Sequence, residues 1–227
     1  FLDNVVDANK YATPEIEKMT KATRKIGLGV MGFADLLIQL RIKYNSIEGR
    51  KLGKDIMSFI RNTADKQSIK LAKERGTFPA WDKSDYGEDE KYRNACRLTV
   101  APTGTISMLA DTSSGIEPTF ALVWKKQNVL EGQSLYFYNK YFINDAKEFG
   151  FYSDIMKAIY VTAEDISHTD HVKMQAAFQE HCDSGISKTI NLSFEATVAD
   201  VKDAYMLAWE SGCKGVTVYR SGSRQQE

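Results

Sequence analysis

The chain has 227 residues, of which 43% are hydrophobic and 26% are charged, a composition typical of a globular protein that buries a core. Its 30 Lys and Arg residues balance its 30 Asp and Glu residues, so charge gives no reason to expect a nucleic-acid partner. No apolar run approaches the roughly 18 residues that span a membrane, and the first residues lack the order of a signal peptide. We therefore predict no membrane partner and a cytoplasmic location, and the three widely spaced cysteines agree with a reducing compartment.

The first half of the chain is predicted to be mainly helical. Helices are expected at 14–25, 33–42 and 46–75. Thr13 is placed to cap the first of them before a proline, Ser46 opens the third, and Gly76 ends it. Residues 77–93 are rich in acidic, aromatic and turn-forming residues, so we expect a surface loop with one short helical turn.

The second half alternates strand-like and helix-like segments. Strands are expected at 97–100, 119–125, 186–192 and 215–219, and helices at 138–148, 171–182 and 198–211. Asp165 or Thr169 could cap the second of these helices, and Thr197 caps the third, which ends at Gly212. Such alternation predicts an α/β fold. Because no repeat, low-complexity tract or linker interrupts the sequence, we expect residues 1–227 to form a single unit.

Residues 27–32, GLGVMG, match the G-x-G-x-x-G pattern of dinucleotide-binding turns and precede a predicted helix. That site also needs a buried strand before the first glycine, so that the following helix points its N-terminus at a pyrophosphate. Here the preceding residues, MTKATRK, are the polar end of a helix, and another helix follows where a strand is required. We therefore interpret these glycines as positions of close backbone packing in the core.

The loop after the strand at 97–100 has groups that can bind an anion. It contains the hydroxyls of Thr103, Thr105 and Ser107, a glycine at position 104 that permits close backbone approach, and a run of backbone N–H groups. A phosphate fits these donors, although composition alone supports an ordinary strand-to-helix turn equally well. Because no lysine follows the glycine, such a loop would hold a phosphate rather than cleave one.

Other residues that could carry chemistry have simpler interpretations. Asp111 and Glu117 follow in the same loop, where carboxylates are usually turn formers and salt-bridge partners. Cys96, Cys182 and Cys213 form no CxxC pair and have no spacing suited to zinc. We therefore interpret the cysteines as buried or idle thiols, and predict neither a metal site nor a catalytic residue in this chain.

Four blocks of the sequence carry a family resemblance: RKIGLGVMGFADLL, RLTVAPTGTISMLADTSSGIEP, HVKMQAAFQEHCDSGISKTINL and AWESGCKGVTVYRSGSR. In this order they resemble the C-terminal part of the large catalytic chain of ribonucleotide reductases, and they are most similar to the adenosylcobalamin-dependent class II. The resemblance implies the C-terminal part of that family's ten-stranded α/β barrel. It also implies that one loop binds the substrate phosphates, chiefly through backbone amides. Its residues are Ala101, Pro102, Thr103, Gly104, Thr105, Ile106 and Ser107.

The chain also departs from the family pattern. None of its cysteines lies in the family's Asn-x-Cys-x-Glu radical motif, and the redox cysteines belong to an earlier part of the family sequence. Thr217 and Val218 stand where class I enzymes have two adjacent tyrosines, which favours adenosylcobalamin as the radical source. The resemblance therefore implies a component of a vitamin B12-dependent ribonucleoside-diphosphate reductase that is inactive alone. A larger partner chain would carry the radical and redox cysteines and bind most of the adenosylcobalamin.

Other functions remain open at this point. The chain could be a non-catalytic nucleotide-binding or regulatory module that keeps the phosphate loop, or a structural partner that contacts no substrate. It could also be a piece of a continuous enzyme. The family loop favours a diphosphate substrate over a triphosphate, and the sequence does not reveal which base is bound.

Overall fold

The computed structural model describes residues 1–129, 133–151 and 153–223. Its helices are α1 (Leu2–Ala8), α2 (Pro14–Thr23), α3 (Phe33–Gln39), α4 (Ile47–Arg75), α5 (Gly104–Leu109), α6 (Lys140–Phe149), α7 (Asp154–Ile159), α8 (His168–Gln179) and α9 (Val198–Glu210), with 3₁₀ turns η1 (Trp81–Lys83) and η2 (Ala163–Asp165). Its strands are β1 (Val123–Val129), β2 (Gln133–Tyr138), β3 (Thr189–Leu192) and β4 (Thr217–Arg220). None of the helices in these described ranges is both long and apolar enough to cross a membrane.

Hydroxyl caps start three helices where the sequence predicts them. The side chains of Thr13 and Ser46 each accept a hydrogen bond from a backbone N–H three residues further on, at 3.3 and 2.9 Å. Thr197 forms a capping box with Asp200 at the start of α9. Gly76 follows the last residue of α4. These caps bond N–H groups that have no partner inside the helix, so the predicted starts of α2, α4 and α9 are confirmed.

Several elements differ from the sequence prediction. The cap of α8 is Ser167, whose hydroxyl accepts from a backbone N–H at 3.1 Å, and neither Asp165 nor Thr169 has that role. Helices α1 and α7 are unexpected, because seven and six residues contain too few apolar positions to show a helical period. The segment 97–100 makes only single bridges, and the strand expected from 119 begins at Val123.

Four extended segments of the chain run parallel and form the sheet part of the fold. Leu28 bridges Leu98, Val100 bridges Ile186, and β3 pairs with β4 along its whole length. Helix α9 connects β3 to β4, as the crossover between parallel strands requires. The predicted α/β class is therefore confirmed in this part of the chain, while β1 and β2 form a separate antiparallel hairpin.

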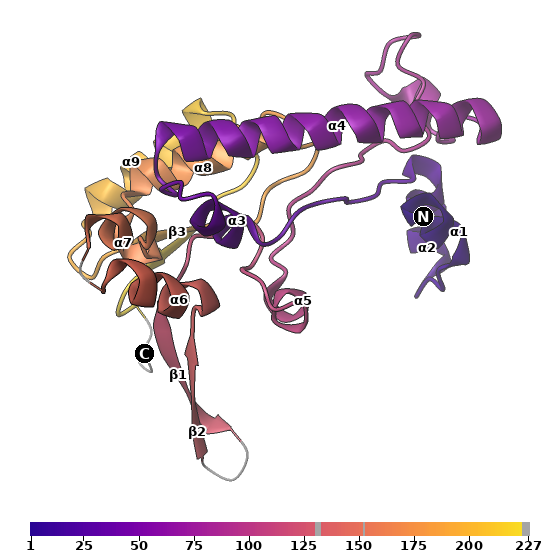
Figure 1. The fold of residues 1–227 in the computed structure, drawn as a ribbon. Coiled ribbons are helices and arrows are strands. Elements are labelled where there is room, and N and C mark those ends of the chain that lie inside the picture. The colour runs from indigo at the N-terminus through magenta and orange to yellow at the C-terminus, as the bar shows by residue number, and fades with distance from the viewer. Residues whose placement is uncertain (130–132, 152, 224–227) are drawn as a thin grey trace.

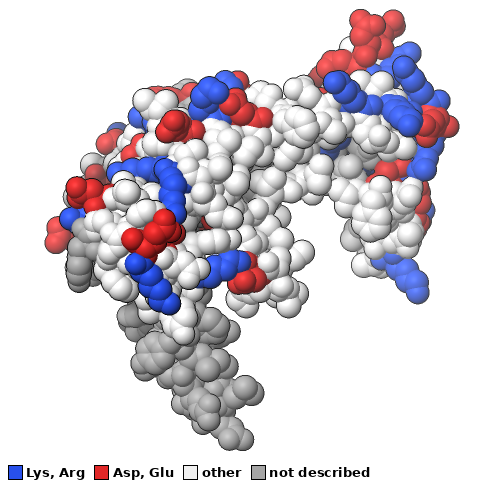
Figure 2. All heavy atoms as spheres, in the orientation of Figure 1, with Lys and Arg blue, Asp and Glu red and all other residues white. Residues whose placement is uncertain are grey.

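The molecule has the shape of an arch (Figure 1). Helix α4 lies across the top, and its 29 residues give a rod of about 44 Å. Helices α1 and α2 lie beneath its C-terminal end, whereas α3, α8 and α9 lie beneath its other half. Helix α5 and the β1–β2 hairpin project from the lower side (Figure 1). Among the described residues, the underside between α5 and the α1–α2 end of the arch shows few charged side chains (Figure 2).

The main core lies beneath the N-terminal half of α4. A Cβ atom on Gly53 would lie 2.4 Å from the ring of Phe178, so this glycine lets α4 contact α8 directly. The Phe178 ring meets Phe33 of α3 edge to face, with centroids 4.9 Å apart. Met57 and Leu98 are fully buried in the same cluster. The core therefore fixes the extended segment that ends at the predicted phosphate loop.

Candidate functional site

Gly29 of the GLGVMG segment lies against neighbouring backbone, and Gly27 and Gly32 lie against threonine side chains. A Cβ atom on Gly27 would lie 2.4 Å from Thr99 Cγ2, and one on Gly29 would lie 2.1 Å from the Thr99 carbonyl oxygen. Gly32 has a φ of +82°, and a Cβ atom there would lie 2.5 Å from Thr112 Oγ1. No side chain fits at these positions without displacing a neighbour. Close packing at these glycines is therefore confirmed, but Gly27 and Gly29 are exposed, so their predicted place in the core is wrong.

The predicted phosphate loop is a turn between the extended segment 97–100 and α5. Five of its seven residues are exposed: Ala101, Pro102, Gly104, Thr105 and Ile106. Thr103 has a left-handed backbone conformation, with φ +54°, and Ser107 is buried. A left-handed residue other than glycine is uncommon and needs support from its surroundings. The chain thus turns sharply at Thr103 and presents the start of α5 to the outside.

Three adjacent backbone amides stand at the start of α5. The first bond of the helix runs from the Ser107 N–H to the Thr103 carbonyl oxygen, at 2.9 Å. The N–H groups of Gly104, Thr105 and Ile106 precede that bond, so they have no partner within the helix. Such N–H groups can bind a phosphate oxygen. The Ser107 amide, which the sequence included among the donors, is instead occupied by the helix.

The hydroxyls of the loop have different surroundings. Thr103 Oγ1 accepts a hydrogen bond from the Gly115 N–H at 2.8 Å, and Ser107 Oγ lies 2.9 Å from Ser114 Oγ. Both hydroxyls therefore hold the turn against the segment that follows α5. Thr105 is exposed, so its hydroxyl is the one of the three predicted donors that faces outward.

A buried carboxylate, Asp35, fixes the segment that follows α5. Its Oδ2 accepts hydrogen bonds from the Ser113 N–H at 2.9 Å and from Thr112 Oγ1 at 3.1 Å. The N–H of Gly32 donates to the Ser113 carbonyl oxygen at 2.8 Å. Sequence reasoning missed Asp35, because an acidic residue in the first turn of a helix is common for electrostatic reasons alone.

A second carboxylate, Glu117, fixes the same segment from the other side. Its Oε1 accepts from the Thr189 N–H at 2.6 Å, and its Oε2 lies 3.4 Å from Lys188 Nζ. The Lys188 side chain has no exposed surface. The salt-bridge role that the sequence suggested for Glu117 is therefore confirmed, although its partner cannot be read from the sequence.

Lys188 also bonds a histidine. Its Nζ lies 2.7 Å from His171 Nδ1 and 3.0 Å from the Thr189 carbonyl oxygen. Because the ammonium group can only donate, Nδ1 accepts, and Nε2 carries the hydrogen that bonds the Ala163 carbonyl oxygen at 3.0 Å. Burial, together with the charge of Lys188, lowers the pKa of His171 to about 3. Burial also lowers the pKa of Lys188, and Glu117 opposes that shift.

The three cysteines are free thiols. Cys182 is buried, and Cys96 and Cys213 are partly buried. Burial raises the pKa of both Cys182 and Cys213. A thiol with a raised pKa is a poor nucleophile at neutral pH, so the interpretation of these two residues as idle thiols is supported.

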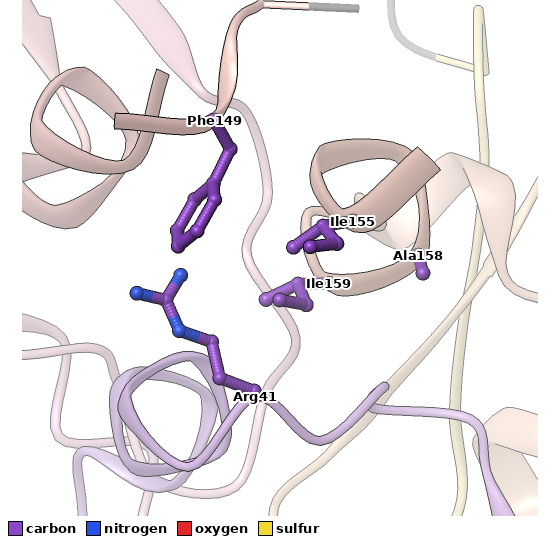
Figure 3. A pocket seen from close by; sticks show the side chains of 5 residues that line it. All are labelled: Arg41, Phe149, Ile155, Ala158 and Ile159. Carbon is purple, nitrogen blue, oxygen red and sulfur yellow. The ribbon is translucent and has the colours of Figure 1, made fainter. Parts of the chain in front are cut away.

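Two hollows on the surface lie apart from the loop. The first, of about 270 Å³, is lined by Arg41, Phe149, Ile155, Ala158 and Ile159, and Figure 3 shows the Arg41 guanidinium beside the Phe149 ring. The second, of about 690 Å³, lies between α4, α8 and the end of α9 and has several lysines on its rim. Neither hollow is lined by a residue of the loop 101–107.

Comparisons with known proteins agree on one family. The family model for the ribonucleotide reductase barrel domain matches residues 1–92 and 87–219. A vitamin B12-dependent ribonucleoside-diphosphate reductase of Thermoplasma acidophilum is 48% identical over 99% of this chain and 32% of its own length. A protein of the same name from Mycobacterium tuberculosis is 42% identical over 99% of this chain and 35% of its own length.

A solved structure gives the same fold. The class Id ribonucleotide reductase alpha subunit of Actinobacillus ureae superposes with a TM-score of 0.78, over 97% of this chain and 44% of that chain, at 21% identity. The predicted α/β fold, part of the reductase barrel, is thus confirmed. The chain spans about a third of the length of the two relatives above. On the family match and these identities, this chain belongs to the ribonucleotide reductase barrel-domain family.

Proposed function

We propose that this chain is a component of a vitamin B12-dependent ribonucleoside-diphosphate reductase. It would supply late strands of the barrel and the loop that binds the substrate phosphates, for the radical reduction of ribonucleotides to deoxyribonucleotides. The names of the relatives support the reaction. One observation supports the role of the loop: an exposed turn presents the adjacent N–H groups of Gly104, Thr105 and Ile106 without partners in the helix.

The chemistry of the loop suits binding rather than phosphate transfer. Backbone N–H groups bind phosphate oxygens without carrying a charge that would stabilise a leaving group. The exposed Thr105 hydroxyl can add one donor. We therefore assign residues 101–107 the task of holding the phosphates in place, with Ser107 contributing through the packing of its side chain.

We further propose that the radical chemistry belongs to a larger partner chain. When bound, adenosylcobalamin would supply the initiating radical. Neither of the two hollows above borders the loop, so neither would place a cofactor beside the substrate phosphates. Cys182 and Cys213 are poorly suited to redox work, because burial raises the pKa of both thiols. We therefore infer that the partner binds most of the cofactor and carries the radical and redox cysteines.

Reconstitution tests this division of labour. The purified chain, given adenosylcobalamin, a dithiol and ribonucleoside diphosphates, should form no deoxyribonucleotide. Adding a large chain that carries the radical and redox cysteines should restore turnover. Product formation by this chain alone would refute the proposal. Tight nucleotide binding without any complex with a large chain would favour a regulatory nucleotide-binding module instead.

Gly104→Leu tests the loop. A Cβ atom at Gly104 meets nothing within 4 Å, and the backbone there is not left-handed, so the variant should fold. Its side chain would crowd a bound phosphate, so we expect KM in the active complex to rise about tenfold or more with a much smaller change in kcat. Gly87→Leu, outside the loop, is the control and should leave KM unchanged, because a Cβ atom there would lie 3.9 Å from Glu90 Oε2, an ordinary contact distance. An unchanged KM for Gly104→Leu would refute the loop assignment.

A further inference from the structure

A buried ammonium group lies behind the segment that supports the phosphate loop. Lys188 Nζ has three partners, Glu117, His171 and the carbonyl oxygen of Thr189. They come from three different parts of the fold: the segment following α5, helix α8 and β3. A buried cation is costly unless all its donors are bonded, and these three partners can satisfy the three donors of the Lys188 ammonium group. The cluster therefore fixes the segment, the helix and the strand relative to one another.

Glu117 is the member of the cluster that lies on the segment following α5. Its two carboxylate oxygens bond two consecutive residues, through the Thr189 N–H and Lys188 Nζ, which fixes both the position and the orientation of the carboxylate. The preceding residue, Ile116, is fully buried, and its carbonyl oxygen accepts from the Tyr44 hydroxyl at 2.6 Å. The chain is thus held on both sides of the peptide bond that joins Ile116 to Glu117.

This anchor continues directly to the phosphate loop. Gly115 donates its N–H to Thr103 Oγ1, and Ser114 Oγ contacts Ser107 Oγ. Thr103 is the left-handed residue at which the chain turns into α5. Glu117 comes two positions after Gly115 and three positions after Ser114, the residues that contact the turn. A shift of Glu117 would therefore move the amides of α5.

We propose that Glu117 is a positioning residue for the substrate-phosphate loop, and that the buried Lys188 fixes it. This inference rests on the proposed function of residues 101–107. It assigns to Glu117 no contact with substrate. Its role is to keep the first turn of α5 where its amides meet the phosphates, because a displacement of about 1 Å at a binding group is enough to weaken binding strongly.

The test uses the active complex and four variants. Glu117→Ala removes both tethers, and Glu117→Gln keeps an acceptor for the Thr189 N–H while removing the charge. In the double variant Glu117→Ala/Lys188→Met the buried ammonium is removed as well, so no uncompensated charge remains. Asp7→Ala is the control, because Asp7 is a carboxylate that also bonds a buried cation, Arg24, but is exposed and lies far along the chain from the loop.

The readouts are KM for the nucleoside diphosphate, kcat at saturation, and the inhibition constant of inorganic pyrophosphate. For Glu117→Ala and for the double variant we expect KM and the pyrophosphate constant to rise together, by about tenfold or more, with kcat changed by less than about threefold. Glu117→Gln should show a smaller rise, because one tether remains. Asp7→Ala should lower the melting temperature without changing either constant.

Two outcomes would overturn the inference. One is an unchanged KM in Glu117→Ala. The other is a normal KM in the double variant. In that case the effect of Glu117→Ala would come only from the unpaired charge that it leaves on Lys188. Failure of the loop assignment itself gives a different pattern, since Gly104→Leu would then also leave KM and the pyrophosphate constant unchanged. If Glu117→Ala does not fold, the double variant and Glu117→Gln still decide the question.

Discussion

The two ends of the arch each contain a buried cation, but the two cations bond different kinds of structural element. Arg24, at the end of α2, donates to Asp3 and to both carboxylate oxygens of Asp7, at 2.8 Å in each case. Both partners lie on α1, one helical turn apart. Lys188 instead bonds one carboxylate on a loop and one neutral histidine on a helix. The first cluster joins two helices, whereas the second supports an exposed turn.

The difference suggests a simple division between stability and binding. Changes to the α1–α2 cluster should alter the free energy of unfolding and leave nucleotide binding alone. Changes to the cluster around Lys188 should alter both, because the loop depends on it.

The largest effect is expected for Asp3→Ala. Asp3 is 3% exposed, and hydrogen bonds from Arg24 and Arg93 hold its pKa below the ordinary value even though burial raises it. Removing it takes one carboxylate acceptor from both Arg24 and Arg93 in a buried cluster, although Asp7 still pairs with Arg24. The free energy of unfolding should therefore fall by about 3–5 kcal/mol. Denaturant titration measures this loss. A loss below about 1 kcal/mol would show that the cluster is not a main support of this end of the arch.

The two clusters should also respond to acid at different pH. In the unfolded chain His171 binds a proton below its ordinary pKa of 6.5, whereas in the folded chain it does so only near pH 3. Between these values the unfolded state holds more protons, so stability falls as the pH falls. The pKa values of Asp3 and Asp7 are instead lowered from 3.8, so their contribution is present above that pH and is lost only below it.

Unfolding measured from pH 6.5 to pH 5 tests this order. We expect a loss of about 2 kcal/mol over this range, at about 1.4 kcal/mol per pH unit for one proton. The variant His171→Gln should remove much of that slope, whereas Asp7→Asn should keep it. An equally steep slope in His171→Gln would show that another group causes the loss.

How far the sequence predicts these features depends on the distance between the residues involved. The caps at Thr13, Ser46 and Thr197 are local patterns, and each was found at its predicted position. The packing of the GLGVMG glycines was also predicted, because their context excluded the alternative. The Glu117–Lys188 pair joins residues 71 positions apart, and no periodicity connects them. Without an alignment or a structure, that contact cannot be predicted.

The elements around the loop follow the same rule. The turn into α5 was expected from a strand followed by small and hydroxyl residues, but the engagement of Thr103 and Ser107 with Gly115 and Ser114 was not. The strand predicted at 97–100 makes only single bridges in the structure. Its partners come from distant segments, and the sequence does not reveal how those segments are aligned. The phosphate-binding role of the loop is implied by the family resemblance, whereas the side chains that support the loop, Asp35 and Glu117, are revealed only by the structure.

The smallest effect is expected for Ser107→Ala, which is compared with loss of a hydroxyl on α2, far from the loop. Ser107 is 2% exposed, and its hydroxyl contacts only groups of the loop, Ser114 Oγ and the Gly104 carbonyl oxygen. Its loss should cost about 1 kcal/mol of stability, and KM should rise about twofold because the turn loosens. Thr23→Val removes an exposed hydroxyl that bonds the Met19 carbonyl oxygen within α2, and it should leave KM unchanged. If both variants leave KM unchanged, the support of the loop lies in Asp35 and Glu117, and the buried hydroxyl contributes only packing.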